Sequence, residues 1–209
     1  MLTQGTIKTI NRFFESTYKE KGSEFIAWAF HVETETEVQN YLDETRKKHY
    51  DASHHCYAFR FKDNSFRYSD AGEPNGTAGI RILNAIDHFG LKDILVIVTR
   101  YFGGTKLGIG PLGKAYYTSA EILLQECSCV EEKAYNRVKI ICDFSFISLV
   151  YRLLSSFSGI IENVEYGQSA AFKSLIPLES TAEFAREMND SSNGNILIEA
   201  ETEIIYHKI

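Results

Sequence analysis

The sequence predicts an α+β protein of two domains, an N-terminal α/β domain over residues 1–130 and a second domain over residues 134–209. Short apolar runs rich in β-branched and aromatic residues alternate with helical patterns, which is typical of mixed structure. The composition changes at residues 128–133, which carry two adjacent glutamates, and we interpret this stretch as a linker. With 209 residues and 44% hydrophobic side chains, the chain can fill a core in each domain.

Capping and turn residues delimit the elements of the first half. Thr34 and Glu37 form a capping-box pattern at a helix start. Gly90 suits the end of a second helix, and Pro111 suits the first turn of a third. The elements expected here are paired strands over 7–17 and 25–32, a helix over 34–49, a hairpin over 56–61 and 65–68, a helix over 77–89, a strand over 94–99 and a helix over 111–127.

The second half shows a regular order of strands and helices. Its expected elements are a strand over 136–144, a helix over 145–158, strands over 159–166 and 170–176, a helix over 180–188 and a strand over 195–205. The order β-α-β-β-α-β within about 70 residues is that of the ferredoxin-like split βαβ arrangement. We therefore expect a ferredoxin-like C-terminal domain.

The cysteines do not form a metal-binding pattern. Cys127 and Cys129 are separated by one residue, whereas zinc sites typically space paired ligands by two to four. We therefore expect reduced thiols, no metal ion and no organic cofactor. Because no apolar run approaches the length of a membrane span and no signal peptide is recognisable, the sequence predicts a soluble cytoplasmic protein.

The net charge of −6 is unevenly distributed along the chain. Residues 1–130 carry 15 basic against 16 acidic side chains, residues 131–209 carry 7 against 12, and residues 60–117 carry 8 against 5. The locally basic stretch can attract phosphate or nucleic acid, while the overall acidity disfavours indiscriminate nucleic-acid binding.

A glycine-rich loop connects the strand expected over 94–99 to the helix expected at Pro111. Glycines let backbone N–H groups approach an anion closely, and a helix N-terminus adds partial positive charge. These features predict phosphate binding, although the Gly-Lys-Ser/Thr triplet of a Walker A motif is absent. The glycines could instead serve only a tight turn against a neighbouring loop. The candidate residues are Arg100, Gly103, Gly104, Lys106, Gly108, Gly110 and Lys114.

A second loop, residues 70–79, combines acidic residues with glycines, and we expect it to support the first. Its carboxylates could cap a helix, bind Mg²⁺ beside a phosphate, act as acid or base, or pair internally with Arg100 or Lys106. Thr77 could act as a nucleophile only beside a base. The supporting candidates are Asp70, Glu73, Gly76 and Thr77, together with His54 in a polar role at the start of the hairpin.

Aromatic residues flank the glycine-rich loop. Tyr101, Phe102, Tyr116 and Tyr117 lie beside its glycines and basic residues, so they are candidates for stacking on nucleic-acid bases. Trp28 lies in an apolar alternation and is expected in the core.

Four stretches of the first half resemble the YigZ/IMPACT family, in its bacterial two-domain form. They are Lys21 to Ala27, Ala52 to Ala58, Ser69 to Gly79, and Val98 to Tyr116. The resemblance implies an N-terminal domain like the second domain of a small-subunit ribosomal protein and a C-terminal domain similar to one in elongation factor G. It implies a translation-linked role with RNA, ribosome or translation-factor partners.

The sequence departs from the family pattern at two positions. Ala71 stands where the family usually has a second consecutive Asp, which weakens a two-carboxylate metal site. Pro111 preserves a helix start but removes one backbone donor from the glycine-rich loop. The leading hypothesis is a translation-associated binding protein that contacts RNA or ribosomal components. The alternatives are an enzyme acting on a phosphorylated small molecule and a protein–protein adaptor.

Overall fold

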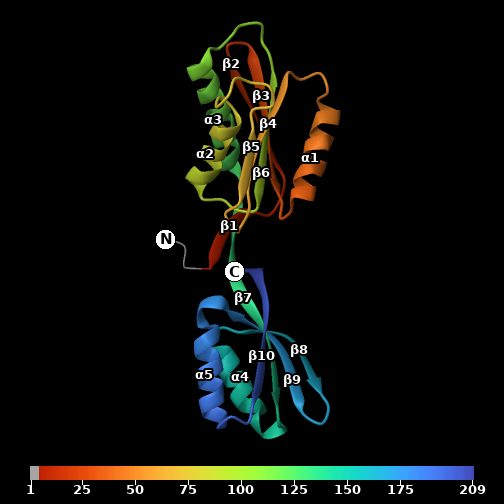
Figure 1. The fold of residues 1–209 in the computed structure, drawn as a ribbon, viewed down its shortest axis with the longest axis vertical. Helices are drawn as coiled ribbons and strands as arrows, with labels where there is room; N and C mark the ends of the chain where they lie inside the picture. The colour runs from red at the N-terminus through yellow and green to blue at the C-terminus, as the bar shows by residue number, and fades with distance from the viewer. Residues whose placement is uncertain (1–4) are drawn as a thin grey trace. The chain divides into compact units, whose positions relative to one another are not determined.

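The computed structural model describes residues 5–209 as a mixed α/β protein (Figure 1). The described residues form two antiparallel sheets and five α-helices. They divide into two compact units. One unit comprises residues 7–130, and the other comprises residues 131–209 together with residues 5 and 6. None of the helices in residues 5–209 combines the length and apolar character that a membrane span requires.

The first unit is built on an antiparallel sheet with helices on both faces. The strands run in the order β2 (Phe14–Glu20), β3 (Ser23–His31), β6 (Ile94–Tyr101), β4 (His54–Arg60) and β5 (Phe66–Ser69). Figure 1 shows α1 (Glu35–Lys48) against one face, and α2 (Gly79–Phe89) and α3 (Ile109–Glu126) against the other. The central strand β6 is buried along seven of its eight residues because helices cover both of its faces.

The predicted caps and helices of this unit are confirmed. The Thr34 side chain accepts from the Glu37 backbone N–H, and the Glu37 carboxylate accepts from the Thr34 N–H, which completes the capping box of α1. Gly90 adopts the left-handed conformation, with a φ of 65°, and ends α2.

The strand predicted over residues 7–17 is interrupted. The chain forms β1 (Thr6–Ile10), leaves the extended ladder at the exposed residues 11–13, and resumes as β2. Lys8 in β1 accepts a backbone hydrogen bond from Lys92, whereas β2 pairs with β3 as expected. The apolar alternation is therefore shared by two strands with different neighbours.

The second unit contains the β-α-β-β-α-β order that the sequence predicts. Its elements are β7 (Cys129–Cys142), α4 (Ile147–Ser156), β8 (Ile160–Tyr166), β9 (Ala170–Pro177), α5 (Thr181–Ser192) and β10 (Leu197–Lys208). The strands lie in the order β10, β7, β9, β8, and every pairing is antiparallel. Both helices bury apolar residues against this sheet, including Leu153 and Phe184. Short 3₁₀ turns at Phe144–Phe146 and Leu178–Ser180 precede them.

The boundary between the two units falls within residues 128–133, as the linker prediction expected, but residues 129–133 are in strand β7, which begins at Cys129. Polar side chains in this stretch lie on paired strands: Glu132 is opposite Lys208, and Lys133 is opposite His207 in β10. Glu132 and Lys208 place opposite charges across the ladder, and Lys133 forms an ion pair with Glu179 at 2.7 Å, so this strand is stabilised without an apolar pattern.

Candidate functional site

The acidic loop is a structural cap for α2. The Asp70 carboxylate accepts three backbone hydrogen bonds, from Gly76 at 2.9 Å, Ala78 at 2.9 Å and Gly79 at 2.8 Å. These donors precede or open α2, where backbone N–H groups have no partner within the helix. Of the roles considered for Asp70, helix capping is the one that the structure shows.

Glu73 is the centre of a buried polar cluster. Its Oε1 accepts from Arg100 Nη1 at 2.7 Å and from the Tyr116 hydroxyl at 2.8 Å. His54 Nε2 lies 3.8 Å from the other carboxylate oxygen. Arg100 is only 6% exposed and also donates to the Ser23 hydroxyl at 3.3 Å. The charge of Arg100 is thus neutralised inside the protein, and its guanidinium is not available to an external phosphate as predicted.

Tyr116 belongs to the core, so the prediction that it stacks on a base is wrong. Its ring is fully buried, and Phe25 contacts it edge-on with ring centroids 5.1 Å apart. Burial raises the pKa of the Tyr116 hydroxyl, and burial raises the pKa of the neighbouring Cys56 thiol to about 12. Cys56 donates to the Asp70 carbonyl at 3.0 Å and is a buried structural thiol.

Thr77 and His54 are held by the acidic loop. The Thr77 hydroxyl is almost fully buried and donates to the Pro74 carbonyl at 2.6 Å, so it does not face solvent as a nucleophile. His54 Nδ1 lies 2.9 Å from the Ala71 carbonyl, which places a proton on that nitrogen. Gly76 contributes backbone groups only.

Gly103 packs directly on Gly22 in the turn between β2 and β3. A Cβ atom added to Gly103 would lie 1.9 Å from the Gly22 carbonyl carbon, which no side chain can tolerate. Gly104 and Gly108 each have a φ of 83°, which favours glycine. For Gly103 the structure shows the tight-turn alternative, because a neighbouring backbone occupies its open side.

The exposed candidates lie beyond this packed turn. Lys106 and Lys114 are exposed, and Phe102 is about half exposed. Tyr101, the last residue of β6, points to the opposite face of the sheet from Arg100, because successive residues of a strand point to opposite faces. Its hydroxyl lies 3.0 Å from His49 Nδ1 and donates to Asp51 at 3.2 Å, on the α1 side of the sheet.

A groove between α2 and α3 brings basic side chains together. Its volume is about 440 Å³. It contains two cations, and no carboxylate is present among the described residues that line it. Its lining residues are Arg81, Asn84, Ile109, Gly110, Gly113, Lys114 and Tyr117.

Sequence reasoning identified Gly110, Lys114 and Tyr117 as candidates, and all three line this groove, but it missed Arg81 and Asn84 as site residues. The spacing of the groove residues along α2 and α3 could have shown that they share helix faces. Arg81 and Asn84 are three residues apart on α2, and Lys114 and Tyr117 are three apart on α3, so each pair shares a helix face. Which two faces meet depends on the tertiary packing of α2 and α3, which periodicity alone does not show.

Comparison with known proteins places these features in a family. The model of the Impact N-terminal domain matches residues 21–124, which include both loops and the groove, and that of a domain of unknown function (DUF1949) matches residues 140–195. IMPACT family member YvyE of Bacillus subtilis is 32% identical over 174 residues, covering 82% of this chain and 80% of that protein. The chain belongs to the IMPACT family. The YigZ member of Escherichia coli is 30% identical over 180 residues, covering 84% of this chain and 88% of that protein.

Matches outside bacteria and among solved structures agree with this membership. Protein IMPACT homolog of Dictyostelium discoideum is 39% identical over 95 residues, which are 43% of this chain and 27% of that protein. The crystal structure of a hypothetical protein superposes with a TM-score of 0.67 at 27% identity, covering 96% of this chain and all of the other. The fold of that solved structure is therefore shared along nearly the whole chain.

Proposed function

We propose that this IMPACT family member is a translation-associated binding protein that contacts RNA through the α2/α3 groove and the exposed end of the glycine-rich loop. The observation that carries the proposal is the charge of the groove: Arg81 and Lys114 line it, and the described lining residues include no acidic side chain. Lys106 adds a third exposed cation two residues before the N-cap Gly108 of α3.

The start of α3 suits a phosphate group. The first backbone N–H groups of a helix have no partner within it, and the helix dipole adds partial positive charge there. Lys114 lies close to this helix start and faces the groove. Tyr117, one helical turn further, presents an aromatic ring on which a base can stack. Phosphate and base contacts would thus come from one helix face.

A binding role is favoured over the enzymatic alternative because the acidic loop has no free carboxylate for chemistry. Asp70 is used by three backbone donors, and Glu73 is paired with Arg100. The described residues that line the groove include no histidine, cysteine or carboxylate, the side chains that most often act as base or nucleophile.

Three finer assignments belong to the same proposal. The strand order β10, β7, β9, β8 supports a ferredoxin-like fold for residues 131–209. The family resemblance implies that the N-terminal domain is like the second domain of a small-subunit ribosomal protein, which would favour an RNA or ribosomal partner. The free state of the four cysteines agrees with a reducing compartment such as the cytoplasm.

The proposal is tested by charge reversal at Lys106 in the glycine-rich loop and at Lys114 in the groove. Fluorescence anisotropy with single-stranded RNA should show that Lys106→Glu and Lys114→Glu each weaken binding by about tenfold or more, because each replaces a phosphate contact with repulsion. Lys47→Glu, at an exposed position on α1 on the other face of the sheet, is the matched control and should have little effect. Equal losses in all three variants would mean that only the net charge matters, and the groove assignment would be abandoned.

A further inference from the structure

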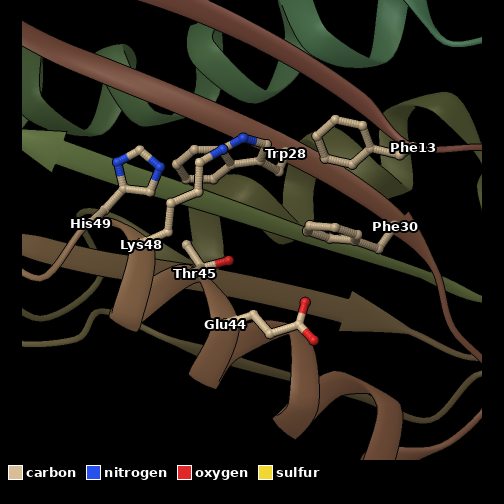
Figure 2. Close-up of a pocket in the computed structure, with 7 residues that line it drawn as sticks. All are labelled: Phe13, Trp28, Phe30, Glu44, Thr45, Lys48 and His49. Carbon is tan, nitrogen blue, oxygen red and sulfur yellow. The ribbon is translucent and has the colours of Figure 1, made fainter.

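A second pocket lies on the α1 face of the first sheet, away from the α2/α3 groove. Figure 2 shows its side chains arranged between α1 and strand β3, with Phe13 coming from the segment just before β2. Its volume is about 160 Å³. The lining residues are Phe13, Trp28, Phe30, Glu44, Thr45, Lys48 and His49.

Three aromatic rings form the inner walls of this pocket. The Trp28 indole N–H donates to Glu15 at 2.8 Å, which fixes the orientation of the ring. Phe13 and Phe30 contact one another with ring centroids 5.2 Å apart, and Phe13 remains 51% exposed. An exposed phenylalanine beside a fixed indole offers an inserted planar ring a surface on which to stack.

The rim of the pocket carries both a hydrogen-bond acceptor and a donor. Glu44 and Lys48 are exposed and one helical turn apart on α1, a spacing at which opposite charges commonly pair. No ion pair joins them or links either to another residue in the described part of the chain. Figure 2 shows the Glu44 carboxylate and the Lys48 side chain at separate positions around the aromatic walls.

His49 adds an acceptor without a partner. The Tyr101 hydroxyl donates its hydrogen to Asp51, so the hydrogen bond between Tyr101 and His49 requires His49 Nδ1 to be the donor. The other nitrogen, Nε2, then carries a lone pair, and it is buried with no hydrogen-bond partner. Because the surrounding residues cover this atom, it makes the end of the pocket wall polar without contacting an occupant.

The charges of the rim exclude most charged occupants. A cationic side chain would suit the aromatic rings and Glu44 but would be repelled by Lys48. A carboxylate or phosphate would suit Lys48 but would be repelled by Glu44. A neutral planar ring that has both N–H donors and a carbonyl acceptor satisfies both rim residues.

We propose that this pocket binds a guanine base. Guanine alone among the common nucleobases has two adjacent donors, N1–H and the N2 amino group, which a carboxylate such as Glu44 can accept together. It also has the O6 acceptor, to which Lys48 can donate. The ring stacks on the aromatic walls, chiefly on the half-exposed Phe13.

The size of the pocket agrees with entry of the six-membered ring of the base. Its volume of about 160 Å³ is close to that of a cavity that holds one benzene molecule, so the ring edge that carries N1, N2 and O6 enters while the five-membered ring, the sugar and the phosphate remain outside. Guanine can therefore come from a free nucleotide or from an unpaired guanosine in RNA. The inference does not depend on RNA binding in the α2/α3 groove, because α1 covers the opposite face of the sheet (Figure 1).

Trp28, the single tryptophan of the chain, reports directly on the pocket. We expect GMP to quench its fluorescence saturably and more strongly than AMP, CMP or UMP at equal millimolar concentration, after correction for nucleotide absorbance. Glu44→Gln should weaken GMP binding about tenfold or more, because one acceptor oxygen becomes a donor. Phe13→Ala, outside the sheet ladder, should weaken it as well. Glu126→Gln, an exposed position on α3, is the matched control and should match the wild type.

Two short single-stranded RNAs that differ only in one central guanosine separate the two sources of guanine. Preference for the guanosine-containing strand over GMP identifies RNA, and the reverse identifies the free nucleotide. Lys106→Ala with Lys114→Ala should leave GMP quenching unchanged. A failure of the groove proposal can therefore be told apart from a failure of the guanine proposal. Equal quenching by all four nucleotides, no saturable quenching, or an unaltered Glu44→Gln variant would overturn the guanine assignment.

Discussion

Among single residues, Glu73 has the largest structural role in the two loops, because it connects the acidic loop to β6 and α3. The carboxylate is 4% exposed, lies 2.7 Å from Arg100 and accepts from Tyr116. Removing one partner of a buried ion pair leaves the other charge unpaired in a medium of low polarity. The cluster therefore stabilises the fold of the loops that position the groove.

Arg100→Ala should lower the free energy of unfolding by about 3–5 kcal/mol, because it leaves the Glu73 carboxylate buried and unpaired. Urea denaturation measures this loss. The control is Arg67→Ala, which removes a bidentate ion pair with Glu35 whose side chains are both 60% exposed. That variant should lose no more than about 1 kcal/mol. Similar small losses in both variants would contradict a structural role for Arg100.

Because its thiol is buried, Cys56 should lower the free energy of unfolding at alkaline pH. Burial raises the pKa of its thiol from 9.0 to about 12 in the folded chain. Between these values the unfolded thiol releases its proton while the folded thiol keeps it, so unfolding is favoured as pH rises. The contribution of the group is fully present below pH 9 and is lost by up to about 1.4 kcal/mol per pH unit above it.

Urea denaturation between pH 6 and pH 11 tests this dependence. Cys56→Ala should show a shallower decline than the wild type above pH 9 and a parallel course below it. Identical slopes in the two proteins above pH 9 would show that the thiol ionises equally in the folded and unfolded states.

At the scale of elements, the glycine-rich loop is specified by its contact with another turn. Gly103 can adopt its position only because a hydrogen replaces a side chain facing Gly22. Gly110, in the first turn of α3, has open space where a Cβ would lie and no positive φ. A side chain would therefore clash with a neighbouring backbone at Gly103, whereas one would fit at Gly110.

Gly103→Ala should destabilise the protein strongly, because its Cβ would lie 1.9 Å from a backbone atom and the two turns would have to separate. Gly110→Ala should be neutral or stabilising by up to about 1 kcal/mol, since alanine favours the helix and meets no neighbour. Thermal unfolding of both variants tests the contrast. A Gly103→Ala protein as stable as Gly110→Ala would contradict the close packing of the turns.

The elements predicted correctly from the sequence are those whose boundaries depend on residues close together in the chain. The α1 cap depends on Thr34 and Glu37, three residues apart, and the end of α2 depends on the conformation of Gly90. The burial of Arg100 could not be predicted in this way. It follows from the register of β6, which places Arg100 between Phe25 in β3 and His54 in β4. The sequence contains all three residues but not their pairing.

The whole molecule has separate cores in its two units. One core joins β3, β4 and β6 to α2 and α3, a second lies beneath α1, and a third joins β7 and β9 to α4 and α5. The buried residues of the third core are all in residues 131–209. A change inside one core should therefore act first on its own unit.

Phe184→Ala should remove hydrogen-exchange protection mainly from residues 131–209. Phe184 is fully buried and contacts Phe157, with ring centroids 5.5 Å apart, so truncation should cost about 3–5 kcal/mol. Protection of β6 in the first unit should change much less. An equal loss of protection in both units would show that they unfold as a single cooperative structure.

The salt dependence of RNA binding tests the central claim most directly, because it counts the phosphate contacts made by the groove. For single strands, the slope of log K against log salt concentration changes by about 0.7 for each phosphate contact removed. We expect Lys106→Ala with Lys114→Ala to make the slope shallower by about 1.4, and Lys47→Ala to leave it unchanged. A wild-type slope in the double variant would contradict the assignment of the α2/α3 groove as the RNA-binding surface.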